Sequence, residues 1–168
     1  VVIAEDRLIT NTEAVDFYVT FDLVKMGELQ GQFIADALDL ANAAGPFNLE
    51  IFSGSQDDPN AKLFYDGAMS VLKPYIDSGK LVVQSGQVSY EQTAIMGWDS
   101  AKAQARMDNL LSGFYADKHL DAALVAADCL AIGVISSLES MGYGTGDVAF
   151  PLITGQDAEL AAVKSIKA

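Results

Sequence analysis

Polar side chains suited to binding hydroxyl groups follow each of several short apolar runs in this sequence. These residues are Asp6, Arg7, Asp22, Asn60, Trp98, Asp128 and Gln156. Carboxylate, amide and guanidinium groups can each bridge two neighbouring hydroxyls by matching donors to acceptors. An indole ring can also cover the C–H face of a pyranose ring. This combination of residue types therefore suits a neutral polyol such as a sugar.

Hydrolysis of a sugar would require two carboxylates in complementary roles. Arg7 directly follows Asp6 and would hold that carboxylate ionised, which makes Asp6 a poor general acid. The sequence alone leaves another catalytic pair open, but it favours binding over catalysis.

Several of the same residues also have plain structural interpretations. Asp22, Asp58 and Asp99 each precede a helical pattern, where Asp is a preferred N-cap residue, and capping is the favoured interpretation for all three. For Asp128, capping and ligand binding are equally expected and can coexist. A lone tryptophan such as Trp98 is more often part of a core than a ligand platform.

The elements that must position these residues are short strands alternating with helices. The expected strands are Val1–Ala4, Phe17–Phe21, Phe47–Phe52, Leu81–Gln84, Ala122–Ala127 and Val148–Ile153. Several runs are continuously apolar, which is typical of parallel strands covered on both faces. The fold class expected is α/β, a doubly wound, mostly parallel sheet with flanking helices. In such sheets the ligand crevice lies outside the carboxyl ends of the strands.

Local signals predict where the helices begin and end. One apolar stripe extends from Met26 to Ala41, and Asp58-Pro59 begins a second helix that Gly79 ends. Residues 5–16 are too few for a helical crossover between parallel neighbours. We therefore expect the chain to pass from one sheet to another there.

Composition narrows the possible partners. The 168 residues contain 23 Asp and Glu against 10 Lys and Arg, a formal charge of -13, so nucleic acid and anionic membranes are poor partners. One cysteine and one histidine exclude an internal disulfide and a cysteine- or histidine-based metal cage. No cofactor is expected. Unpartnered elements at both ends suggest a fragment of a longer chain.

Five stretches of the sequence carry a resemblance to a known family. They are Ile3–Ile9, Gly54–Met69, Gly97–Asp99, Ala127–Gly133 and Gly155–Glu159. In this order they resemble the type I periplasmic binding proteins of bacterial ABC importers, in the xylose-binding and multiple-sugar-binding branch. Differences from the family pattern at Leu23, Lys102 and Ala127 concern which sugar is bound.

The resemblance implies one lobe of a two-lobed fold. Residues 1–22 would hold the last strand of the amino-terminal lobe and a hinge crossing. Residues 23–154 would form the carboxy-terminal lobe, and residues 155–168 would return to the amino-terminal lobe.

The resemblance also implies a function and a site. The protein would be a periplasmic, non-enzymatic component that binds a monosaccharide, an aldose such as xylose or glucose, and delivers it to an inner-membrane permease. A membrane sugar-sensing receptor is a further expected partner. The implied ligand residues are Asp6, Arg7, Asn60, Trp98, Asp128 and Gln156. The alternative is the effector-binding core of a sugar-responsive repressor, which would need a basic DNA-binding headpiece that this sequence does not show.

Overall fold

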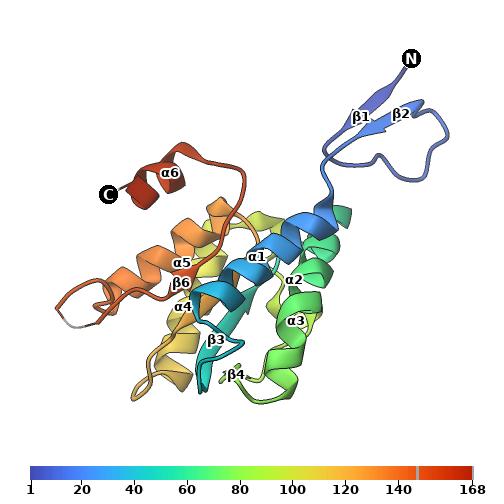
Figure 1. Ribbon diagram of the computed structural model, residues 1–168. Helices are drawn as coiled ribbons and strands as arrows, with labels where there is room; N and C mark the ends of the chain where they lie inside the picture. The colour runs from blue at the N-terminus through green and yellow to red at the C-terminus, as the bar shows by residue number, and fades with distance from the viewer. Residues whose placement is uncertain (147, 168) are drawn as a thin grey trace.

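The computed structural model describes residues 1–146 and 148–167. Positions 147 and 168, which fall within the expected ranges 23–154 and 155–168, lie outside the described residues. A parallel sheet of four strands in the order β4-β3-β5-β6 forms the centre of the molecule (Figure 1). These strands are β3 (Phe47–Phe52), β4 (Leu81–Val82), β5 (Ala122–Val125) and β6 (Leu152–Ile153). The expected α/β class with a parallel sheet and flanking helices is confirmed.

Helices cover both faces of this sheet. The helices are α1 (Leu23–Ala37), α2 (Pro59–Asp77), α3 (Tyr90–Thr93), α4 (Ser100–Phe114), α5 (Asp128–Ser140) and α6 (Leu160–Lys167). Successive residues of β3 point to opposite faces, so Ile51 packs with α1 and α2 while Phe52 packs with α4 and α5. In β5, Leu124 and Val125 divide between the two faces in the same way. The continuous apolar runs thus fill two cores, one on each side of the sheet.

Local chemistry determines most helix ends. Asp58 caps α2, Pro59 occupies its first turn, and Gly79 follows its end with a φ of +75°, as the sequence predicts. Helix α1 ends at Ala37, four residues before the end of the predicted stripe at Ala41. Asp39 adopts a φ of +47°, which a continuing α-helix does not allow. The last apolar residues of the stripe therefore belong to a turn.

The expected change of sheet between residues 5 and 16 is wrong. Strands β1 (Ile3–Glu5) and β2 (Phe17–Val19) pair with each other in parallel, with Ile3 opposite Phe17. Each strand is only three residues long, so an extended loop can return along one strand without a helix. The chain changes sheets after β2 instead, just before α1.

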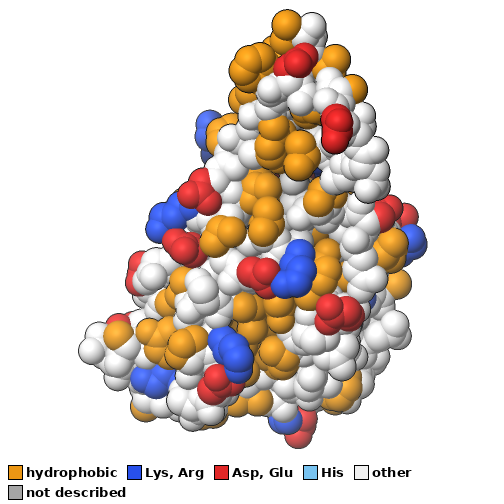
Figure 2. All heavy atoms as spheres, turned by 90° about the vertical axis from the view of Figure 1, so that its right-hand side faces the viewer, with side chains coloured by type: hydrophobic (Ala, Val, Ile, Leu, Met, Phe, Trp, Pro, Cys, Tyr) orange, Lys and Arg blue, Asp and Glu red, His pale blue; other side chains and the backbone are white. Residues whose placement is uncertain are grey.

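The two-stranded β1–β2 sheet projects from one end of the molecule (Figure 1). Apolar side chains are exposed on it, including Ile3, Phe17 and Val19, and Phe21 just after β2 is exposed too. In the space-filling view, apolar side chains gather at this narrow end (Figure 2). Across the described residues, every helix is too short or too polar to span a membrane.

Candidate functional site

A cleft of about 320 Å³ lies where the β1–β2 sheet meets the carboxyl ends of the central strands. Five of the six residues predicted to bind a ligand line it. They are Asp6, Arg7, Asn60, Trp98 and Gln156. They come from four separate segments: the β1–β2 loop, the start of α2, the turn before α4, and the segment after β6. The sixth residue, Asp128, is not among the lining residues of this cleft.

Arg7 is held by two carboxylates. Its Nε lies 2.6 Å from Oδ2 of Asp58, and its Nη1 lies 3.3 Å from Oδ2 of Asp6. The hydrogen bond to Asp58 is the main cause that raises the pKa of Arg7. More than half of the Arg7 side chain remains exposed, whereas that of Asp58 is 6% exposed. The guanidinium group is thus fixed in direction while part of it still faces solvent.

Asp58 has a larger role than the capping interpretation assigned to it. Its Oδ1 accepts the backbone N–H of Asn60 at 2.9 Å, which is the expected cap. Its Oδ2 also accepts the Nε1–H of Trp98 at 3.1 Å, in addition to the Arg7 contact. Sequence reasoning missed this second role. Its position two residues before Asn60, in the same strand-end loop, was the available signal.

Asn60 connects the two sheets across the cleft. It lies in the first turn of α2 and is buried. Its Nδ2 donates to the backbone carbonyl of Asp6 at 3.1 Å, and the Tyr18 and Thr20 hydroxyls donate to the same oxygen. Asp6 itself has a φ of +64°, so this loop is held in a left-handed conformation. Together these bonds bring the Asp6–Arg7 pair to the edge of the central sheet.

Trp98 ends a 3₁₀ turn, Met96–Trp98, that directly precedes α4. The side chain is partly buried and packs against the core cluster on the α4 and α5 face. It also lines the cleft, so packing against the core and access to the cleft are combined in one side chain. Cys129 lines the same cleft, and burial raises the pKa of its thiol.

Gln156 presents an unused acceptor. Among the described residues, its Oε1 is buried without a hydrogen-bond partner. Buried amide oxygens usually have partners, so this oxygen is suited to accept a hydrogen bond from a ligand hydroxyl. Gln30 of α1 fastens the preceding backbone, because its Nε2 donates to the carbonyls of Ala126 and Gly155.

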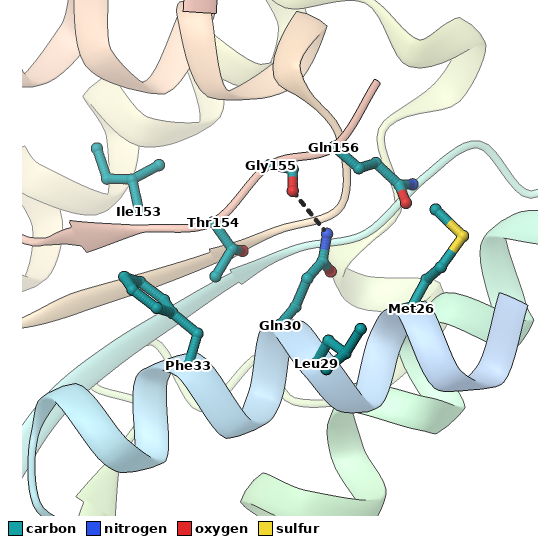
Figure 3. A pocket seen from close by; sticks show the side chains of 8 residues that line it. All are labelled: Met26, Leu29, Gln30, Phe33, Ile153, Thr154, Gly155 and Gln156. Atoms are coloured by element: carbon teal, nitrogen blue, oxygen red, sulfur yellow. Dashed lines mark hydrogen bonds between the residues drawn. The ribbon is translucent and has the colours of Figure 1, made fainter. Parts of the chain in front are cut away.

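Figure 3 shows this fastening beside a second cavity of about 360 Å³ between α1 and the segment after β6. The Gln30 amide points up from α1 to the Gly155 carbonyl, and the Gln156 side chain extends towards Met26. Leu29 and Phe33 make the remaining α1 side of this cavity apolar. Gln156 lines both cavities, but of these two only the cleft that contains Asp6 and Arg7 is lined by charged side chains.

Asp128 is placed differently from its neighbours in the prediction. The N-cap of α5 is Ala127, and Asp128 is the first helical residue, so the capping interpretation of Asp128 is wrong. Its Oδ2 accepts the backbone N–H of Glu159 at 2.9 Å, and its own N–H donates to the Gln156 carbonyl at 3.1 Å. The side chain borders another cavity, between α5, β6 and α6. Asp128 therefore fixes the segment that carries Gln156.

Of the remaining strand-end aspartates, two are plain caps and one is perturbed. Asp22 caps α1 and Asp99 caps α4, each by accepting a backbone N–H at 3.0 Å. Asp157 lines the cleft, and its pKa is raised by burial and by the nearby carboxylates of Asp128, Glu159 and Asp6. Arg7 opposes this shift. The cleft thus contains one cation among several carboxylates.

The chemistry of the cleft matches hydrogen bonding to a polyhydroxylated ligand. It offers guanidinium and amide donors, carboxylate and amide acceptors, and one aromatic ring. The residues that the structure describes contain no cluster of three or more side chains arranged to hold a metal ion.

The sequence of this chain matches a known protein family. A family model described as "Periplasmic binding protein domain" matches residues 1–168. The chain is 59% identical to the multiple sugar-binding periplasmic receptor ChvE of Rhizobium radiobacter, over 98% of its own length and 47% of that protein. It is 39% identical to the D-xylose-binding periplasmic protein of Escherichia coli, over 99% of its length and 45% of that protein. The chain therefore spans about half the length of the curated relatives that it matches.

A solved structure shares the architecture. An ABC transporter solute-binding protein from Clostridium phytofermentans with bound β-D-glucose superposes with a TM-score of 0.91 at 48% identity. The match covers 98% of this chain and 50% of that one. The fold described above thus matches one lobe of that solute-binding protein.

Proposed function

This chain belongs to the periplasmic binding protein domain family, and we propose that it forms the larger part of the sugar site in a periplasmic solute-binding protein. The full-length protein would bind a monosaccharide, with an aldose such as glucose or xylose as the expected class. It would deliver the sugar to the permease of an ABC importer without changing it chemically. A membrane sugar-sensing receptor is a second proposed partner. The observation that carries this proposal is the single cleft lined by Asp6, Arg7, Asn60, Trp98 and Gln156.

The division of the chain follows from its two sheets. We propose that residues 1–22, with β1 and β2, belong to the amino-terminal lobe and its first hinge crossing. Residues 23–154 would form the carboxy-terminal lobe around the four-stranded sheet, and residues 155–168 would cross back. All three parts contribute residues to the lining of the cleft, which supports a ligand held from more than one side.

Each proposed ligand residue has a role that suits its environment. Arg7 and Asn60 would donate to sugar oxygens, and Asp6 would accept from hydroxyls. The unpartnered Oε1 of Gln156 would accept another hydroxyl proton. Trp98 would cover the apolar face of the ring. Asp128 would act on the ligand from the edge of the site, although its carboxylate also binds the Glu159 backbone. The buried Asp58 would align both Arg7 and Trp98.

Calorimetric titration with D-glucose and D-xylose tests the proposal. The sample is the full-length protein, meaning the complete natural polypeptide that contains these 168 residues. We expect a dissociation constant of about micromolar or tighter for at least one of the two sugars. Asn60→Ala should weaken binding at least about tenfold, because the sugar would lose its hydrogen bonds to the buried Asn60 amide.

The matched control is Asn109→Ala, which removes an exposed amide of α4 that is not among the residues lining the cleft. This variant should bind like the wild type. Absence of binding to any aldose by the folded full-length protein would overturn the proposed function. Equal effects of the two substitutions would remove Asn60 from the site.

A further inference from the structure

The backbone of Trp98 adopts a conformation that its side chain does not favour. Its φ is +53°, and that of the preceding Gly97 is +75°. Left-handed conformations at bulky residues are uncommon and persist only where surrounding contacts determine them. The contacts that hold this turn therefore decide where the indole lies.

Those contacts come from the loop that follows β3. The backbone N–H of Ile95 donates to the Ser53 carbonyl at 3.0 Å, which extends the edge of β3 by one bridge. The backbone N–H of Gly97 donates to Oγ of the fully buried Ser55 at 2.7 Å. The same hydroxyl also hydrogen-bonds to Asp57. The turn before α4 is thus attached along its length to residues 53–55.

Gly54, at the centre of this loop, is where the ring itself is seated. A Cβ built on Gly54 would lie 2.0 Å from Cη2, 2.3 Å from Cζ2 and 2.7 Å from Cζ3 of Trp98. These three atoms form the outer edge of the six-membered ring of the indole. Distances this short cannot exist, so any side chain at position 54 would have to displace the ring. Gly54 is required for close approach, not for its own backbone conformation.

Two sets of contacts limit that displacement. The indole packs against the core cluster, and its Nε1 is bonded to the buried Asp58 at 3.1 Å. The indole also lines the cleft, which is open space. A ring pushed off Gly54 would therefore move into the space of the ligand and would lose its alignment with Asp58.

We propose that Gly54 is a positioning residue that sets the depth of the Trp98 indole in the cleft, and so the room left for a sugar ring. This inference rests on the proposed function, because it assumes that the cleft holds a sugar. Gly54 would thereby influence how much space the cleft offers to a sugar ring without itself touching the sugar.

A double-mutant cycle with Gly54→Ala and Trp98→Phe tests this role. Phenylalanine lacks the three outer ring atoms that meet Gly54, so the two changes should not be additive. In the full-length protein, Gly54→Ala alone should weaken aldose binding about tenfold or more, while in the Trp98→Phe background it should weaken binding by less than about threefold. Equal losses in both backgrounds would overturn the proposal.

A measurement without sugar separates this inference from the proposed function. Trp98 is the only tryptophan of these 168 residues. With any tryptophan elsewhere in the full-length protein replaced by phenylalanine, the fluorescence reports on this one side chain. Gly54→Ala should increase quenching by acrylamide, because the indole moves outward. The matched control is Gly113→Ala, since a Cβ at Gly113 meets nothing within 4 Å, and its quenching should equal that of the wild type.

Each outcome decides the matter. Unchanged quenching in a folded Gly54→Ala protein would overturn the positioning role, whatever the sugar results. If Gly54→Ala does not fold, restoration of folding by Trp98→Phe would support the contact, and failure to restore it would count against it. Absence of sugar binding by the wild type, together with increased quenching in Gly54→Ala, would overturn the proposed function while leaving the seating of Trp98 intact.

Discussion

Asp58 and Asp128 both follow a strand at the same edge of the sheet, yet their carboxylates bind different parts of the chain. Asp58 faces the cleft and contacts Arg7 and Trp98. Asp128 contacts the backbone of Glu159, beside another cavity. Their location at the strand ends was predictable from the sequence, but the group that each carboxylate binds depends on which distant segment packs nearby.

The proposed ligand role of Asp128 leads to a first prediction. Asp128→Asn keeps an oxygen to accept the Glu159 N–H and removes the charge, so thermal stability without sugar should change little. Sugar affinity of the full-length protein should fall about tenfold or more, as charge-assisted hydrogen bonds are lost. Calorimetry and thermal unfolding of the same samples measure both quantities. Unchanged affinity would assign Asp128 to structural support alone.

Asp157 leads to a prediction about pH. Burial and the neighbouring carboxylates raise its pKa in the folded protein above the ordinary value for Asp. The resulting stabilisation is present below the ordinary carboxyl pKa and is lost as the pH rises through the raised value. Asp157→Asn should therefore be more stable than the wild type at neutral pH, and this gain should shrink towards about pH 4.

Urea unfolding of both proteins at several pH values measures this difference. Asp157 is only partly buried and the residue as a whole is exposed, so solvent screens the effect and the gain should be modest. Asp157 has a φ of +89°, and any effect of Asn on that conformation does not vary with pH. A stability difference that stays constant with pH would contradict the charge argument.

At the level of elements, close contact of α1 and α2 depends on small residues. A Cβ at Gly67 of α2 would lie 2.1 Å from the carbonyl oxygen of Val24 in α1, and Gly27 of α1 meets α2 just as closely. Asn60 lies in the first turn of α2, so the packing of α2 against α1 also affects the position of Asn60. Helix spacing on this face of the sheet therefore affects the cleft.

Gly67→Ala should destabilise the chain by about 1–3 kcal/mol, since the added methyl forces the helices apart. Chemical denaturation measures the loss. Gly113→Ala in α4, where a Cβ meets open space, should instead be neutral or stabilising by up to about 1 kcal/mol. If both substitutions behave alike, helix propensity rather than packing would explain the result.

At the scale of the whole molecule, the chain holds only part of the proposed site. The β1–β2 sheet exposes Ile3, Phe17 and Val19 at 60%, 61% and 58%, and such a group of exposed apolar side chains often marks a surface that another part of a protein covers. The matched relatives are about twice as long. We infer that further parts of the full-length protein cover this sheet and complete the grip on the ligand.

The 168-residue chain alone should therefore bind monosaccharides weakly. Each missing charge-assisted hydrogen bond would cost about 1.5–3 kcal/mol, so losing several should reduce affinity by about three orders of magnitude or more. Calorimetry on the isolated chain, with the full-length protein as reference, measures this loss. Micromolar or tighter binding by the isolated chain would show that one lobe suffices.

The sequence by itself determined the α/β class, the approximate places of the strands and both ends of α2. Several strands are shorter than the apolar runs that predicted them, such as β6 within the expected Val148–Ile153. These features depend on chemistry within a few residues: continuously apolar runs such as that of β5, the Asp58-Pro59 start of α2, and the left-handed Gly79 after its end. The candidate residues were also foreseeable, because strand ends meet at one edge of a parallel sheet.

Only the tertiary structure decided how those residues are combined. The Arg7–Asp58 pair joins positions 51 residues apart, and the Trp98–Asp58 bond joins positions 40 apart. The parallel pairing of β1 with β2 and the seat of Trp98 on Gly54 are of the same kind. The physical reason is that such contacts depend on the packing of distant segments, and no local propensity encodes which segments meet.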